Sequence, residues 1–190
     1  MIRQQSEQTE LGRLAVTSGQ LGLWIFLATA TMLFAGFTSA YLVRQAGPDW
    51  RSIPLPPLLW LNSGVIVASS FSLERGRAHT LARPSAGYLW IVIAWFLGVG
   101  FLLGQVFAWK FLADQGVYLP SNPHSSFFYI LTGVHGVHVL GGLIALGALL
   151  LWRNRMPRSR WEQRLKLCAT YWHFMGGLWL YLFVVLFVLG

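Results

Sequence analysis

Charged side chains divide the chain into five long uncharged stretches. The 14 Lys and Arg residues and the 6 Asp and Glu residues all lie outside residues 14–43, 52–73, 84–109, 115–152 and 167–190. Each stretch reaches the roughly 20 residues that an α-helix needs to cross about 30 Å of hydrocarbon. The pattern predicts transmembrane helices at approximately residues 20–43, 54–73, 85–110, 125–152 and 166–189.

Two other arrangements fit the pattern poorly. A water-soluble helix would show one apolar stripe and one charged face, and none of the five stretches does. Strands of a membrane barrel would be about 10 residues long with alternating polarity, which is also not seen. Charged residues make up 11% of the chain, against about 25% in soluble domains. We therefore expect an all-α integral membrane bundle that forms a single transmembrane domain over residues 1–190.

The basic residues are unevenly distributed between the two ends of such a bundle. With five crossings, only Arg44, Arg51 and Lys110 lie on one side, and the rest of the 14 lie on the other. The positive-inside rule then places the N-terminus in the cytoplasm and the C-terminus in the periplasm of a bacterial inner (plasma) membrane. We read the net charge of +8 as a topology signal, with no nucleic-acid partner. Glu7 and Glu10 speak against a cleavable signal peptide.

Polar side chains within the predicted helices are the candidates for function, and no carboxylate is among them. Gln105, His135, His138 and His173 are prominent, and ionisable residues inside a membrane are functional candidates by default. Cys168 is the only cysteine, so the chain can form neither an internal disulfide nor a cysteine-based metal cluster.

The histidines allow two interpretations. They could share a haem or metal site, or they could form hydrogen bonds between helices, which is the interpretation that we favour. His135 and His138 are three residues apart and share a helix face. His138 lies about 21 Å, and His173 about 9 Å, from the cytoplasmic ends of their predicted helices, a depth difference too large for one ion. His79 and His124 are expected in loops, where they carry little information.

Four segments carry a resemblance to a known family. Residues 126–142 read SFFYILTGVHGVHVLGG and residues 171–182 read YWHFMGGLWLYL. Together they resemble the paired signatures of subunit III of haem-copper terminal oxidases. Residues 21–42 (LGLWIFLATATMLFAGFTSAYL) and 100–109 (GFLLGQVFAW) resemble an early and a middle helix of that family, in its short five-helix form.

The resemblance implies an accessory subunit that has no redox centre of its own. In the family, haem and copper belong to subunits I and II, while subunit III packs against subunit I, retains phospholipid and supports proton uptake and turnover stability. The matching residues imply structural hydrogen bonding and lipid contact, with no catalytic or metal-binding role. They are Gln105, His135, His138, Trp172, His173 and Trp179.

Three positions depart from the family pattern, because Ala30, Ala108 and Gly176 stand where relatives can carry acids. This chain is therefore expected to act by packing and lipid retention, without a proton relay of its own carboxylates. Two alternatives stay open. One is a subunit III-like accessory protein of a nitric oxide reductase, and the other is a small transporter or channel.

Overall fold

The computed structural model describes residues 18–82 and 84–189. Arg3, Arg13 and Arg83, which enter the charge distribution, lie outside the described residues, as do Glu7 and Glu10. The long helices are α2 (Ser18–Gln45), α3 (Leu58–Ala82), α4 (Pro84–Asp114), α5 (Pro123–Leu151) and α6 (Arg158–Val188), with a short 3₁₀ helix η1 (Arg153–Arg155) between the last two. The described part contains no strand, so the prediction of an all-α fold is confirmed.

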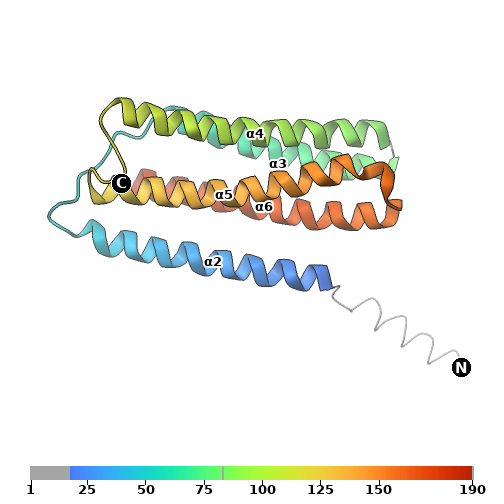
Figure 1. The fold of residues 1–190 in the computed structure, drawn as a ribbon, viewed down its shortest axis with the longest axis horizontal. Helices are drawn as coiled ribbons and strands as arrows, with labels where there is room; N and C mark the ends of the chain where they lie inside the picture. Colours follow the sequence, from blue (N-terminus) through green and yellow to red (C-terminus); the bar gives the residue numbers. More distant parts are fainter. Residues whose placement is uncertain (1–17, 83, 190) are drawn as a thin grey trace, which may run out of the picture.

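The five long helices lie side by side along the long axis of the molecule (Figure 1). α3 and α4 form one hairpin, and α5 and α6 form a second hairpin that contacts the first. α2 packs against α5 and α6 on the outside of the bundle. The core therefore lies between the two hairpins, and α2 covers one side of the second.

Two glycines let α3 and α4 approach closely near the turn that joins them. A Cβ atom added to Gly87 would lie 2.8 Å from the backbone nitrogen of Thr80, and one added to Gly76 would lie 3.0 Å from the carbonyl oxygen of Gly87. Any larger residue would push the backbones apart, as in other membrane helix pairs that meet through small residues.

Four of the helices are long and apolar enough to cross a membrane. They are Ser18–Gln45, Ser85–Asp114, Pro123–Leu151 and Arg158–Val188. α3 is not among them, because its second half carries Glu74, Arg75 and Arg77. Nevertheless α3 runs beside α4 along the same axis (Figure 1).

Several helix ends differ from those predicted. α3 ends at Ala82 rather than residue 73, and α6 begins at Arg158 rather than residue 166. Both extensions carry Arg and Glu, which end a hydrophobic window but are good helix formers. α3 starts only at Leu58, after the Pro54, Pro56 and Pro57 cluster, because proline restricts the residue before it to extended conformations.

The start of α5 has a well-defined cap. The side chain of Asn122 accepts a hydrogen bond from the backbone N–H of Ser125 at 3.1 Å, and the Ser125 hydroxyl accepts one from the backbone N–H of Asn122 at the same distance. This reciprocal pair satisfies donors that a helix start leaves free, and Pro123 occupies the first turn, where it is tolerated.

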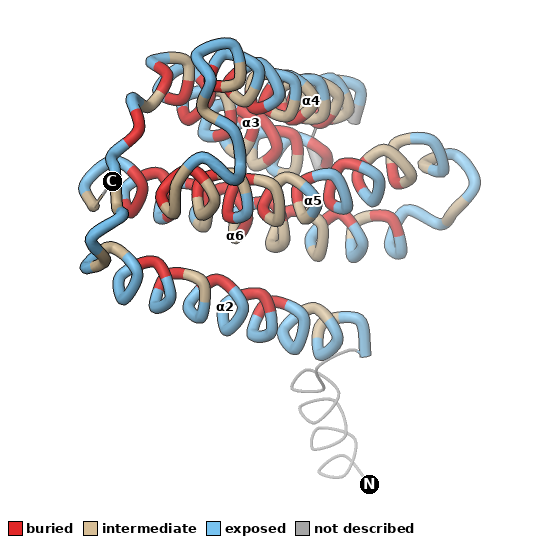
Figure 2. Tube along the Cα trace, turned by 60° about the vertical axis from the view of Figure 1, so that its left-hand side comes forward, coloured by how far each residue is buried: buried red, intermediate tan, exposed pale blue. Residues whose placement is uncertain are grey.

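Buried residues face the interior of the bundle (Figure 2), and many large apolar side chains are exposed. Exposed fractions of Met32, Phe96 and Val137 are 77%, 63% and 69%. Soluble monomers rarely expose apolar surface so widely, so this surface fits contact with lipid.

Candidate functional site

Two tryptophans of α6 join it to α3 through buried serines. The indole N–H of Trp172 donates to Ser69 Oγ at 3.1 Å, and that of Trp179 donates to Ser63 Oγ at 3.0 Å. Ser69 in turn donates to the carbonyl of Ala94 on α4 at 2.7 Å. Trp172, Ser69 and Ala94 thus form a hydrogen-bonded chain across three helices.

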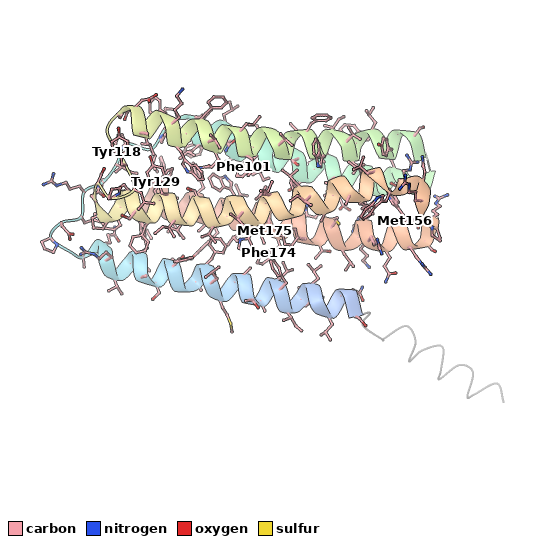
Figure 3. All side chains as sticks on the ribbon, viewed as in Figure 1. Phe101, Tyr118, Tyr129, Met156, Phe174 and Met175 are labelled. Carbon is pink, nitrogen blue, oxygen red and sulfur yellow. The ribbon has the colours of Figure 1, made fainter. Side chains whose placement is uncertain are left out.

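His135 lies in an aromatic cluster at the centre of the bundle. Its ring centroid is 5.4 Å from that of Trp179, 5.9 Å from Phe101 and 6.3 Å from Phe34. Phe101, labelled in Figure 3, extends from α4 toward α5. Rings from α2, α4 and α6 therefore surround the imidazole, which is fully buried.

Neither Gln105 nor His135 makes the interhelical hydrogen bond that we expected of it. Both amide atoms of Gln105 and both ring nitrogens of His135 are buried without a hydrogen-bond partner. The ring nitrogens of His135 have no partner because aromatic rings surround the imidazole. Gln105 follows Phe101 by one helical turn on α4 and is 2% exposed.

His138, on α5, contacts both α2 and α6. Its Nδ1–H donates to the Val134 carbonyl at 2.7 Å, within the same helix. Its own carbonyl accepts from the Tyr171 hydroxyl at 2.8 Å, and its ring lies 5.8 Å from the rings of Phe26 and Phe34 on α2. His138 therefore helps to join α2, α5 and α6.

The depth difference expected between His138 and His173 is wrong. Trp161 donates to the Leu149 carbonyl at 3.1 Å, and Tyr171 reaches His138 farther along. These two bonds fix the alignment of α5 and α6, and they place His138 level with Tyr171, two residues from His173. The estimate failed because α6 begins at Arg158, well before the predicted start.

His173 faces α3 rather than the other histidines. Its Nε2 lies 3.3 Å from Glu74 Oε2, and the other carboxylate oxygen of Glu74 accepts from Arg77 at 2.6 Å. Glu74 was missed because the sequence pattern ended this helix at residue 73. The charge itself was the available signal, since helices often continue through charged residues.

His79 and His124 are both in helices, which corrects the expectation that they lie in loops. His124 is fully buried near the start of α5. Its Nδ1 accepts from the backbone N–H of Ile53 at 3.1 Å, and its ring stacks on Trp50 at 5.0 Å. His124 thereby fastens the connection between α2 and α3 to the end of the bundle. Its sequence position between turn-forming residues concealed this role.

The same connection carries an exposed ion pair. Arg44 donates a hydrogen bond to the carboxylate of Asp49. This bond holds the pKa of Asp49 below its usual value. Because both side chains are about half exposed, solvent screens the pair, and it contributes little to stability.

The three positions at which relatives can carry acids are tightly packed here. Ala30 is 3% exposed and Ala108 is fully buried. A Cβ atom on Gly176 would lie 3.0 Å from Ser70 Oγ. A side chain at Gly176 would therefore press on Ser70.

An apolar groove lies between α2 and the α5–α6 hairpin. Its volume is about 430 Å³, and its walls include Leu23, Phe26, Ala145, Leu167 and Tyr171. A groove of this kind can hold a hydrocarbon chain, because its walls are mostly apolar.

The described residues contain no group of three or more His, Cys, Asp or Glu side chains that could hold a metal ion. His138 faces α2, His135 is enclosed by aromatic rings, and His173 pairs with Glu74. In the described structure, each of these three histidines contacts side chains of a neighbouring helix.

Comparison with known proteins gives one consistent result. The family model described as "Cytochrome c oxidase subunit III" matches residues 3–190. A protein of Mycobacterium tuberculosis (strain ATCC 25618 / H37Rv) named "Probable cytochrome c oxidase subunit 3" is 33% identical over 181 residues, which cover 88% of this chain and 86% of the relative.

Relatives in other bacteria agree. The "Cytochrome c oxidase subunit 3" of Synechocystis sp. (strain ATCC 27184 / PCC 6803 / Kazusa) is 34% identical over 177 residues, covering 88% of this chain and 74% of the relative. The protein of the same name from Bacillus sp. (strain PS3) is 26% identical over 176 residues, covering 90% and 85%. The similarity therefore extends over nearly the whole chain.

Proposed function

The chain belongs to the cytochrome c oxidase subunit III family, and from this premise we propose how it serves its complex. It is an accessory subunit of a haem-copper oxidase, and so part of an oxidoreductase complex. We propose that it packs against subunit I, that its partners in the complex are subunits I and II, which carry the haem and copper, and that it is itself non-catalytic. Its contribution is to stabilise the complex during turnover.

One observation carries this proposal. Several polar side chains at the centre of the bundle connect helices, as in the chain from Trp172 through Ser69 to Ala94. Hydrogen bonds between membrane helices stabilise a bundle by about 0.6–1.7 kcal/mol each. A rigid bundle of this kind can brace a neighbouring subunit without taking part in electron transfer.

We further propose that this subunit retains phospholipid. The groove of about 430 Å³ between α2 and the α5–α6 hairpin supports this, because an acyl chain fits apolar walls. The roles of Gln105, His135, His138, Trp172, His173 and Trp179 are then structural, through ring packing and, at four of them, the polar contacts described above.

For topology, we propose five crossings in the bacterial inner (plasma) membrane, with the N-terminus cytoplasmic and the C-terminus periplasmic. The ends of α3 and α6 that carry Arg75, Arg77, Arg158, Arg160 and Lys166 lie at the same end of the bundle (Figure 1). α3 counts as a crossing because its 25 residues run beside α4 and exceed the roughly 20 residues that a bilayer requires. Its charged second half then lies toward the cytoplasm, where basic residues are favoured.

Support of proton uptake is proposed to be indirect. Ala30, Ala108 and Gly176 supply no carboxylate, and the carboxylate of Glu74 is paired with His173 and Arg77. Any effect on proton uptake therefore acts through packing of the neighbouring subunits. Removing the subunit should shorten the active lifetime of the complex while its initial pumping stoichiometry stays near normal. An immediate loss of pumping, with electron transfer intact, would contradict this part of the proposal.

Purification of the native complex tests the main proposal. A tag on this chain should bring down subunits that show oxidase haem spectra and reduce oxygen, and mass spectrometry should identify subunits I and II. If the tagged chain instead brings down a nitric oxide reductase, the assignment to an oxidase complex is wrong.

A further inference from the structure

An ionisable pair lies on the outer surface between α3 and α6. Glu74 Oε2 is 3.3 Å from His173 Nε2, and their side chains are 45% and 39% exposed. Arg77 donates to the same carboxylate at 2.6 Å and is 39% exposed. These three side chains therefore face away from the core of this chain.

In the proposed topology, His173 lies at a depth where lipid would offer acyl chains. It is two residues from Tyr171, which bonds to His138 near the middle of α5. The next residue along the chain from Tyr171, Trp172, bonds to Ser69 in the core. Ionisable side chains at such depth almost always face a protein interior or a partner, because hydrocarbon cannot form hydrogen bonds with them.

Two exposed glycines extend this surface toward the other end of the bundle. A Cβ atom on Gly64 or on Gly177 would meet nothing within 4 Å. The bond between Ser63 and Trp179 places these two glycines at about the same level on adjacent helices. Small residues let another helix approach the backbone closely. We call the surface formed by Gly64, Glu74 and Arg77 of α3 and Lys166, His173 and Gly177 of α6 the α3–α6 seam.

The cytoplasmic end of the seam carries excess positive charge. A hollow of about 260 Å³ is lined there by Arg77, Thr80, Glu162, Leu165 and Lys166. Arg77 is paired with Glu74, and Glu162 is paired with Arg158. Among the ion pairs of the described residues there is none for Lys166, so the hollow favours an incoming carboxylate.

We propose that the α3–α6 seam docks a membrane-spanning helix of a partner subunit, which covers the Glu74–His173 pair and presents an acidic side chain to Lys166. The inference rests on the proposed function, since it locates the contact through which this subunit joins its complex. A bound phospholipid is the weaker occupant. Its phosphate could reach Lys166, but its acyl chains would cover Glu74 and His173 without hydrogen bonds.

Matched substitutions in the tagged, full complex test this contact. Gly177→Phe fills the seam, and Gly100→Phe is its control, because Gly100 is an exposed helical glycine with nothing within 4 Å on a different helix. Lys166→Glu reverses the charge in the hollow, and Arg160→Glu makes the same change on exposed surface outside it. We expect each seam variant to lower the yield of copurified partner subunits about tenfold, a loss of about 1.4 kcal/mol, while each control retains them.

A crosslinking experiment gives an independent readout should a variant fail to accumulate. A photoreactive amino acid in place of Leu180, which follows Gly177 by one turn and is 40% exposed, should form an adduct with a partner subunit. The same residue in place of Leu103 on α4, 54% exposed, should not.

Two outcomes overturn the inference. One is partner yield at the wild-type level in both seam variants, and the other is loss of phospholipid alone together with Leu180 adducts only to lipid. Failure of the proposed function is a distinct result, because the wild-type chain would then copurify without any haem-bearing subunit.

Discussion

The hydroxyl of Tyr171 donates a hydrogen bond to the main-chain carbonyl of His138 at 2.8 Å, which joins the middle of α6 to the middle of α5. The ring of Tyr171 also lies 5.8 Å from that of Phe26 on α2. One side chain therefore links three helices, by a hydrogen bond on one side and by ring packing on the other.

Tyr171→Phe should remove the hydrogen bond and keep the ring contact. We expect the free energy of unfolding of the subunit to fall by about 0.6–1.7 kcal/mol, measured in mixed micelles with increasing denaturing detergent. Tyr118→Phe is the control, because the Tyr118 side chain is 56% exposed and its substitution should change the free energy by less than about 0.5 kcal/mol. Equal effects of the two variants would show that the bond to His138 contributes nothing.

Two adjacent serines of α3 should respond differently to the same substitution. Ser69→Ala removes the bonds to Trp172 and to the Ala94 carbonyl and leaves a buried indole N–H unpaired, which we expect to cost about 1–3 kcal/mol. Ser70→Ala removes a hydroxyl that has no hydrogen-bond partner and should be close to neutral. The same detergent titration checks both, and a larger loss for Ser70→Ala would contradict the hydrogen-bond chain described for α3, α4 and α6.

Two glycines of α4 provide a similar comparison for packing. A Cβ atom on Gly98 would lie 2.6 and 2.7 Å from ring carbons of Trp172, so Gly98→Ala should destabilise the subunit by about 1–3 kcal/mol. Gly100→Ala meets nothing within 4 Å and should stabilise it by roughly 0.5–1 kcal/mol, because alanine is the better helix former. Thermal unfolding of the purified subunit would rank the two variants, and the reverse ranking would show that Trp172 is not packed against α4.

The topology can be tested with single cysteines. Two variants in a Cys168→Ser background each carry one cysteine. One is Ser159→Cys, at the start of α6, and the other is Ser121→Cys, just before α5. Both positions are exposed. An impermeant thiol reagent added to whole cells should label residue 121 from the periplasm, and it should reach residue 159 only after the membrane is opened. Labelling of both residues in intact cells would overturn the proposed orientation.

The location of the helices was predictable from the charge pattern, but their ends were not. Charged residues such as Glu74 and Arg158 end a hydrophobic stretch, yet they do not end a helix, and both lie inside helices here. The absence of charge reports contact with hydrocarbon, whereas a helix ends where its backbone hydrogen bonds end. The predicted and observed boundaries therefore differ most where a helix extends beyond the apolar stretch.

Candidate side chains could be named from the sequence, but most of their partners could not. The family resemblance singled out Trp172 and Trp179, whereas Ser63 and Ser69 resemble any small residue of a membrane helix. Which helices are neighbours is a tertiary property that residue spacing within one helix does not contain. The same limit concealed Glu74 as the partner of His173 and Ile53 as the partner of His124.

The position of α2 has a consequence for the order in which the protein can assemble in the membrane. α2 packs against α5 and α6, and Thr38 accepts its hydrogen bond from Tyr181, 143 residues later in the chain. At roughly 5–20 residues per second of synthesis, this partner arrives on the order of 10 s after Thr38 itself. Until α5 is made, α2 has neither of the helices against which it packs, while α3 and α4, which follow each other directly, are free to pair. The helix that is made first of those described is thus among the last to find its place.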